Sequence, residues 1–102
     1  MFDFNGKSVL ITGASYGLGE QFAYAFADAG ADLVLTARSE DLLQNVADGC
    51  TAKGSNVIAV TGDVSIEDDV RSVVAAGIDA HRKIDILINN AGIADMRGVA
   101  PE

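Results

Sequence analysis

The sequence has one cysteine, one proline and no tryptophan. A single cysteine excludes an internal disulfide and a thiolate metal cluster, so we expect Cys50 to be a buried, inert thiol. No apolar run approaches the roughly 20 residues that cross a bilayer, and residues 1–5 lack the basic start of a signal peptide. We therefore expect no membrane partner and a cytoplasmic location.

Basic residues are also scarce. Seven Lys and Arg stand against fifteen Asp and Glu, which gives a net charge of −8. Nucleic acids and anionic membranes bind through clustered Lys and Arg, so this balance argues against both as partners. The length of 102 residues is enough for one domain, residues 1–102, with a core of modest size.

The most informative feature that is present is a glycine-rich stretch. Residues 12–19 are Thr-Gly-Ala-Ser-Tyr-Gly-Leu-Gly, between an apolar run at 9–11 and a helix-like segment. Glycines let the backbone turn sharply and approach a ligand closely, and the helix that follows offers unpaired N–H groups to an anion. Glycines also serve ordinary tight turns, but the strand before and the helix after this one favour a turn that binds pyrophosphate.

Apolar residues alternate between strand-like and helix-like periods along the chain. The pattern predicts strands at 8–12, 32–37, 56–61 and 84–89, and helices at 20–29, 40–53 and from 66 onward. The continuous apolar runs of the first two strands indicate burial on both faces. A βαβαβαβ order requires parallel strands joined by right-handed crossovers. The expected fold class is therefore α/β, a doubly wound Rossmann-type parallel sheet, of which four strands and three helices form an incomplete, N-terminal part.

Each predicted helix has an apolar stripe that should face the sheet. The three stripes consist of Leu18, Phe22, Ala25, Phe26 and Ala29; of Leu42, Leu43, Val46, Ala47 and Cys50; and of Ile66, Val70, Val73, Val74 and Gly77. Ser39 is the expected N-cap of the second helix, and Ser65 with Asp68 indicates a capping box at the third. Gly30 and Gly54 are expected to end the first two helices, and Gly77 weakens the interior of the third.

Two further motifs end predicted strands. Asp63-Val64 follows the third strand, and Asn89-Asn90-Ala91-Gly92 ends the fourth. Together with residues 12–19, these motifs resemble those of the short-chain dehydrogenase/reductase (SDR) family, of the type often called classical. The resemblance covers residues 7 to about 93 and implies an NAD(P)-binding Rossmann fold. All three motifs would then line one groove at the carboxyl ends of the strands.

The resemblance also implies roles for individual residues. The residues that would hold the phosphates and the adenosine ribose are Gly13, Ser15, Tyr16, Gly17, Leu18 and Gly19. Asp63 would accept a hydrogen bond from the adenine amino group, and Val64 would pack on the ring. The stretch Asn90, Ala91 and Gly92 would run beside the nicotinamide ribose, whereas Asn89 would brace the sheet.

The choice between NAD and NADP is expected at the end of the second strand, where an acid would bind the ribose 2′-OH of NAD. Here the sequence is Thr36-Ala37-Arg38-Ser39, without an acid. Arg38 can meet a 2′-phosphate with a bidentate, charge-assisted contact, and the Ser15 hydroxyl can add to it. We therefore prefer NADP over NAD. The alternative for Arg38 is a surface charge near Glu40 and Asp41.

Enzymes of this family transfer a hydride between a nicotinamide and an alcohol or carbonyl carbon, and they use a tyrosine, a lysine four residues later and an upstream serine. Tyr16 and Tyr24 are followed at that spacing by Glu20 and Asp28, so we assign no catalytic residue. The chain resembles the N-terminal part of a longer homo-oligomeric enzyme for a small alcohol or carbonyl substrate, and the isolated chain should be inactive. The alternatives are a non-catalytic dinucleotide-binding or redox-sensing module and a remnant without a stable fold.

Three remaining features are weighed against simpler explanations. His81 lies at a basic helix end, where positive charge complements the dipole, so we assign it no catalytic role. Asp63 and the acids at 67–69 could suggest a metal, but acids in a first helical turn are dipole partners, and we expect no metal site. The edge of the predicted strand at 84–88 would expose apolar surface, which predicts poor solubility.

Overall fold

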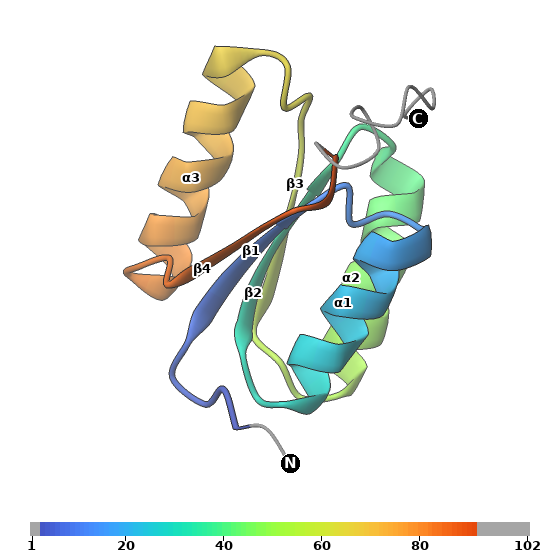
Figure 1. The fold of residues 1–102 in the computed structure, drawn as a ribbon, viewed down its shortest axis with the longest axis vertical. Coiled ribbons are helices and arrows are strands. Elements are labelled where there is room, and N and C mark those ends of the chain that lie inside the picture. Colours follow the sequence, from blue (N-terminus) through green and yellow to red (C-terminus); the bar gives the residue numbers. More distant parts are fainter. Residues whose placement is uncertain (1–2, 92–102) are drawn as a thin grey trace.

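The computed structural model describes residues 3–91 and shows a parallel sheet covered by helices on both faces (Figure 1). The elements are β1 (Ser8–Thr12), α1 (Gly17–Asp28), β2 (Asp32–Ala37), α2 (Glu40–Ala52), β3 (Val57–Thr61), α3 (Glu67–His81) and β4 (Ile86–Asn89). Within residues 3–91, no helix has the length and apolar character needed to cross a membrane. The alternation of strands and helices confirms the predicted Rossmann-type α/β class.

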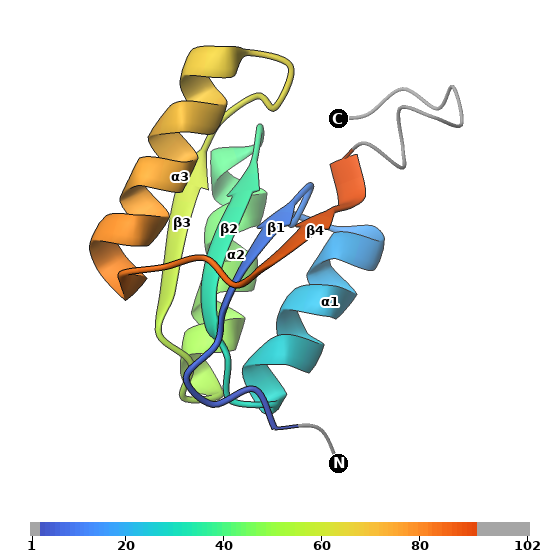
Figure 2. The ribbon, with the colours of Figure 1, turned by 60° about the vertical axis from the view of Figure 1, so that its left-hand side comes forward.

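The direction in which successive strands are added to the sheet reverses beside β1. The sheet runs β3-β2-β1-β4, and every neighbouring pair is parallel. α1 and α2 cover one face and α3 covers the other (Figure 1, Figure 2). The first three strands therefore progress in one direction, and the crossover through α3 returns the chain to the far side of β1. Ligands of open α/β sheets bind at such a switch point.

The two central strands are buried, as their apolar runs predicted. Every residue of β1 and all but the first residue of β2 are buried. Val9 and Leu33 lie opposite each other in the sheet and belong to the core under α1 and α2. Leu10 and Val34 point to the other face and form a smaller core with Val73 of α3. Apolar burial contributes about 25 cal/mol per Å², so these strands are the frame on which the loops are held.

The face of α1 that contacts the sheet differs from the predicted stripe. Its buried residues are Gly19, Ala23 and Ala27. Leu18 and Ala25, which the periodicity placed inward, are exposed, Leu18 by 52%. Small residues occupy the line of closest contact because they let the helix approach the sheet, while larger side chains pack at its flanks. The prediction was right for Phe22 and Phe26, which pack against the core, and wrong for Leu18 and Ala25, because periodicity shows the width of an apolar face but not its centre.

Single residues of the other two stripes also differ from their predicted positions. Leu42 of α2 is 45% exposed. Val70 of α3 is 39% exposed and lines a cavity between α3 and the sheet. Gly77 is buried, and a Cβ built there would lie 2.9 Å from Val34 Cγ2. Gly77 therefore allows α3 to approach the sheet closely, which offsets its low helix propensity.

The helix ends follow the sequence signals except at the starts of α1 and α3, and α1 begins at Gly17 rather than at the predicted residue 20. The predicted capping box was wrong: α3 begins one residue later, and no side chain caps it. The Ser65 hydroxyl instead donates to Asp63 Oδ1 at 2.7 Å, because a local side-chain bond within the loop competes with capping. Ser39 occupies the N-cap position of α2, although its side chain makes no capping bond. Gly30 and Gly54 follow the C-caps of α1 and α2 with φ of 91° and 97°, as predicted.

β4 forms one edge of the sheet and exposes apolar surface, as the sequence predicted. Within residues 3–91, it pairs with β1 alone. Leu87, in the middle of this strand, is 59% exposed. Exposed apolar edge strands promote association between chains.

Replacing Leu87 by lysine is expected to raise the solubility of the chain several-fold. The change removes exposed apolar surface and places a charge where edge-to-edge pairing would begin. Light scattering against protein concentration measures the onset of association. Leu42→Lys is the control, because Leu42 is 45% exposed but lies on α2, away from this edge. An equal gain in both variants would show that apolar exposure in general, rather than the edge, limits solubility.

Candidate functional site

The carboxyl ends of the strands bring the sequence motifs to one edge of the sheet. The glycine turn at 13–19 spans the end of β1 and the start of α1, Arg38 follows β2, Asp63 and Val64 come after β3, and Asn90 and Ala91 follow β4. Parallel strands all end on the same side of a sheet, so these segments border one groove. Gly92, the remaining residue of the predicted site, lies outside the described residues.

The glycine turn is folded tightly on itself and against the segment after β4. Gly13 and Gly17 have φ of 62° and 60°, in the left-handed region that glycine favours. A Cβ at Gly13 would lie 3.0 Å from Asn90 Nδ2. A Cβ at Gly19 would overlap the carbonyl oxygen of Gly13. Glycine is therefore required at 13 and 19 for the packing of the turn itself.

Three features of the turn suit an anionic ligand. Ser15 Oγ is buried and has no hydrogen-bond partner within residues 3–91. The space in front of Gly17 is open, because no atom lies within 4 Å of the position of its Cβ. The N–H groups in the first turn of a helix have no intrahelical partners, and no side chain caps those of α1. The phosphates of a dinucleotide fit this arrangement, with Tyr16 and Leu18 about half exposed at its rim.

A hydrogen-bond network joins the end of β1 to the segment after β4. Thr12 Oγ1 donates to Asn89 Oδ1 at 3.1 Å and accepts from the Ala91 N–H at 3.2 Å. Asn90 Nδ2 donates to the carbonyl oxygen of Gly13 at 3.1 Å. Asn89 therefore braces the sheet, as expected. No separate role was predicted for Thr12 from the sequence, although a hydroxyl at the end of a buried strand is a signal for such a bond.

The carboxylate of Asp63 is held ionised in the loop after β3. The hydroxyl and the backbone N–H of Ser65 donate to Asp63 Oδ1 at 2.7 and 2.9 Å. These bonds lower the pKa of Asp63 below its usual value, the bond from the hydroxyl most of all, and the charge of Arg38 adds to the effect. Asp63 Oδ2 accepts no hydrogen bond within residues 3–91, so it is available to a ligand donor.

Arg38 directly follows β2, and its charge acts on Asp63 in the loop after β3. Arg38 is exposed, and the end of β2 carries no acid. In the part of the chain that the structure describes, Arg38 forms no ion pair with Glu40 or Asp41. The side chain is therefore available to a negatively charged ligand.

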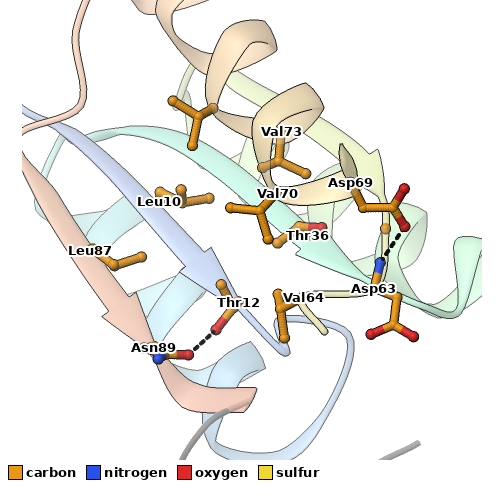
Figure 3. A pocket seen from close by; sticks show the side chains of 12 residues that line it. Leu10, Thr12, Thr36, Asp63, Val64, Asp69, Val70, Val73, Leu87 and Asn89 are labelled. Atoms are coloured by element: carbon orange, nitrogen blue, oxygen red, sulfur yellow. Dashed lines mark hydrogen bonds between the residues drawn. The ribbon is translucent and has the colours of Figure 1, made fainter. Parts of the chain in front are cut away.

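A cavity of about 210 Å³ lies beneath the β3 loop, on the α3 face of the sheet (Figure 3). Its walls and rim are formed by Leu10, Thr12, Thr36, Gly62, Asp63, Val64, Asp69, Val70, Val73, Val74, Leu87 and Asn89. Thr36 Oγ1 is buried without a partner among the described residues. Asp69 was assigned only a dipole role by sequence, yet its carboxylate bonds the backbone of Asp63. The cavity thus connects the β3 loop with the switch point beside β1.

Cys50 and His81 lie outside this edge of the sheet. Cys50 is buried, and burial raises the pKa of its thiol to about 11, so the thiol stays protonated at neutral pH, as expected of an inert cysteine. His81 ends α3, with Nε2 at 2.9 Å from the carbonyl oxygen of Leu33, near the start of β2. Both residues therefore belong to the packing of the domain.

With this geometry in place, comparison with known proteins identifies the family. A sequence profile described as short chain dehydrogenase matches residues 7–101. The chain belongs to the short-chain dehydrogenase family.

Curated relatives of this short-chain dehydrogenase chain are much longer. It is 50% identical over 94 residues to 11-beta-hydroxysteroid dehydrogenase-like 4A of Arabidopsis thaliana, and the match covers 91% of this chain and 31% of that protein. It is 47% identical over 91 residues to glucose 1-dehydrogenase of Gluconobacter oxydans, with 87% and 34% covered. The chain therefore spans about a third of the length of these relatives.

Solved structures of other proteins match the fold of this chain. L-Sorbose reductase from Gluconobacter frateurii, complexed with NADPH and L-sorbose, is 39% identical with a TM-score of 0.85, over 89% of this chain and 35% of that one. A short chain dehydrogenase/reductase from Burkholderia phymatum in complex with NAD is 39% identical with a TM-score of 0.81, over 85% and 31%. The predicted family and the predicted fold are both confirmed.

Proposed function

We propose that this chain is the NADP-binding, N-terminal portion of a short-chain dehydrogenase that transfers a hydride between NADP(H) and an alcohol or carbonyl compound. The observation that supports this most directly is the convergence of the glycine turn, Arg38, the β3 loop and the Asn90-Ala91 segment on one sheet edge. The relatives named as hydroxysteroid and glucose dehydrogenases act on compounds of this class according to their names.

The glycine turn would hold the pyrophosphate. Gly13, Gly17 and Gly19 shape its backbone, and the uncapped N-terminus of α1 offers N–H groups and a partial positive charge. The orphaned Ser15 hydroxyl would donate to a phosphate oxygen. Tyr16 and Leu18, exposed at the rim, would border the adenosine ribose.

The two ends of the dinucleotide would lie on opposite sides of this turn. Asp63 Oδ2 is open to the adenine amino group, and Val64 offers an apolar surface to the ring. Asn90, Ala91 and Gly92 would run beside the nicotinamide ribose. The nicotinamide, when bound, supplies or accepts the hydride. The isolated chain has no Tyr-x-x-x-Lys, so we expect it to bind the cofactor without turnover.

Family membership does not choose between the two cofactors, because neighbours were solved with NADPH and with NAD. The end of β2 favours NADP. It has no acid to repel a 2′-phosphate, and the exposed Arg38 has no competing ion pair within residues 3–91. A guanidinium binds phosphate with two parallel hydrogen bonds.

Arg38→Ala is expected to weaken NADPH binding by about tenfold to a hundredfold, since hydrogen bonds to charged groups contribute about 1.5–3 kcal/mol. NADH binding should stay the same, because NADH has no 2′-phosphate. Titration calorimetry with both nucleotides measures the two affinities. Arg71→Ala is the matched control, because Arg71 is exposed on α3 and pairs with Glu67. An equal loss for NADH, or no loss for NADPH, would contradict the role of Arg38.

A further inference from the structure

Asp69, in the first turn of α3, reaches back to the loop that ends β3. Its Oδ2 accepts the backbone N–H of Asp63 at 2.9 Å, across six residues of sequence (Figure 3). Both residues are only partly exposed, so the bond is shielded from water. A partly buried, charge-assisted bond to a backbone N–H restrains a loop more than an exposed one does.

The same loop is held from the other side by β2. The Gly62 N–H donates to the carbonyl oxygen of Ala37 at 3.0 Å. A Cβ at Gly62 would lie 3.5 Å from Asp69 Cβ and 3.6 Å from Thr36 Oγ1, so the loop backbone packs closely between β2 and α3. The consequence is that Gly62 and the Asp63 backbone are fixed, while the Asp63 carboxylate remains on the outer side of the loop.

The other acids of this helical turn do not make such a contact. Glu67 pairs with Arg71, and Asp68 is exposed without a hydrogen bond to the loop. All three acids face the same partial positive charge of the helix N-terminus. What distinguishes Asp69 is therefore its bond to the Asp63 backbone rather than its charge.

We propose that Asp69 is a positioning residue that sets the β3 loop for recognition of the adenine ring. The inference rests on the proposed function, in which Asp63 Oδ2 accepts from the adenine amino group. Asp69 itself does not touch the cofactor. Without its carboxylate, the Asp63 N–H loses its partner, and the loop keeps the Gly62 bond to β2 and the bond from the Ile66 N–H to the Asp63 carbonyl. The Ser65 bonds hold Asp63 Oδ1 only relative to Ser65 in the same loop, so the direction of the carboxylate relative to the sheet is no longer set.

The experiment compares NADPH with its hypoxanthine analogue, which carries a carbonyl oxygen in place of the adenine amino group. The wild-type chain should prefer NADPH, because the ionised Asp63 carboxylate only accepts hydrogen bonds, which the adenine amino group donates and the carbonyl oxygen of the analogue does not. Asp69→Ala should lower NADPH affinity by about tenfold and remove this preference. Asp69→Asn keeps an acceptor oxygen and should keep the preference. Asp68→Ala removes the same charge from the same turn and should behave as wild type.

Hydrogen exchange of the Asp63 amide gives a second reading that does not depend on ligand. The amide should be protected in wild type and in Asp69→Asn, and exposed in Asp69→Ala. The inference is overturned if Asp69→Ala retains the adenine preference, or if Asp69→Asn loses it. The second outcome can be measured even if Asp69→Ala does not fold. A wild-type chain with a protected Asp63 amide that binds neither nucleotide would instead overturn the proposed function, and the adenine role with it.

Discussion

Replacing Gly19 by alanine is expected to abolish NADPH binding and to destabilise the fold. A Cβ at this position would overlap the carbonyl oxygen of Gly13 and lie 2.9 Å from Asn90 Nδ2. The overlapped atom belongs to the backbone, so no side-chain rotation can relieve the clash. The helix would gain at most about 1 kcal/mol from alanine in place of glycine, whereas overpacking at a buried site costs about 1–3 kcal/mol or more. The clash therefore dominates.

The loss of binding follows from the same displacement. Gly13 can yield only by moving the turn, and this movement would also break its bond from Asn90. The N–H groups at the start of α1 would then no longer converge on one phosphate. Calorimetric titration with NADPH and urea unfolding measure the two effects on the same sample.

Gly54→Ala is the matched control for Gly19→Ala. Gly54 has a φ of 97°, has no atom within 4 Å of its Cβ position, and lies after α2, away from the site. Alanine there costs about 1–2 kcal/mol of backbone strain but should leave NADPH affinity unchanged. If Gly19→Ala bound NADPH as tightly as Gly54→Ala does, the tight packing of the turn would not be needed for binding.

Thr12→Val is expected to lower the free energy of unfolding by about 1–3 kcal/mol, because it leaves the Ala91 N–H without its acceptor. Valine has nearly the shape of threonine, and Thr12 is only 7% exposed, so packing is preserved while the hydroxyl is lost. The bond to Asn89 spans 77 residues of sequence, so its loss removes a contact that holds the end of β1 to the end of β4. NADPH affinity should fall with stability, since Asn90 contacts the glycine turn through the same segment.

The comparison variant for this prediction is Thr51→Val. The Thr51 hydroxyl bonds the Ala47 carbonyl within α2, on an exposed part of the helix, so its removal should change stability by a few tenths of a kcal/mol, roughly. Thermal unfolding of both variants provides the measurement. Equal stabilities of Thr12→Val and Thr51→Val would show that the β1–β4 network is not a major source of stability.

The central part of the fold could be predicted from the sequence with the correct bounds. β1 and β2 have the bounds predicted for them, 8–12 and 32–37, because the apolar runs at their centres mark strands buried on both faces. The site could be located for a related reason: parallel strands end on one side, so motifs at strand ends must share an edge. The capping of α3 could not be predicted, because the Ser65 hydroxyl can bond either the start of the helix or Asp63, and the loop conformation selects Asp63.

The roles of Thr12 and Asp69 were beyond the reach of the sequence because their partners lie on other segments. A hydroxyl or carboxylate shows only that a hydrogen bond is possible, and its partner depends on where distant backbone groups are placed. The two interactions differ in range, 77 residues for Thr12 with Asn89 and six for Asp69 with Asp63, but both depend on how a helix or strand docks on the sheet.

The sequence by itself determined the type and order of the elements, the family and the sheet edge on which the motifs meet, because backbone periodicity and turn chemistry are local properties. Only the tertiary structure decided that Gly19, Ala23 and Ala27 form the contact line of α1, and that Asp69 holds the loop of Asp63. The physical reason is that close packing and hydrogen-bond pairing are set by distances between segments, and these distances exist only once the helices lie on the sheet.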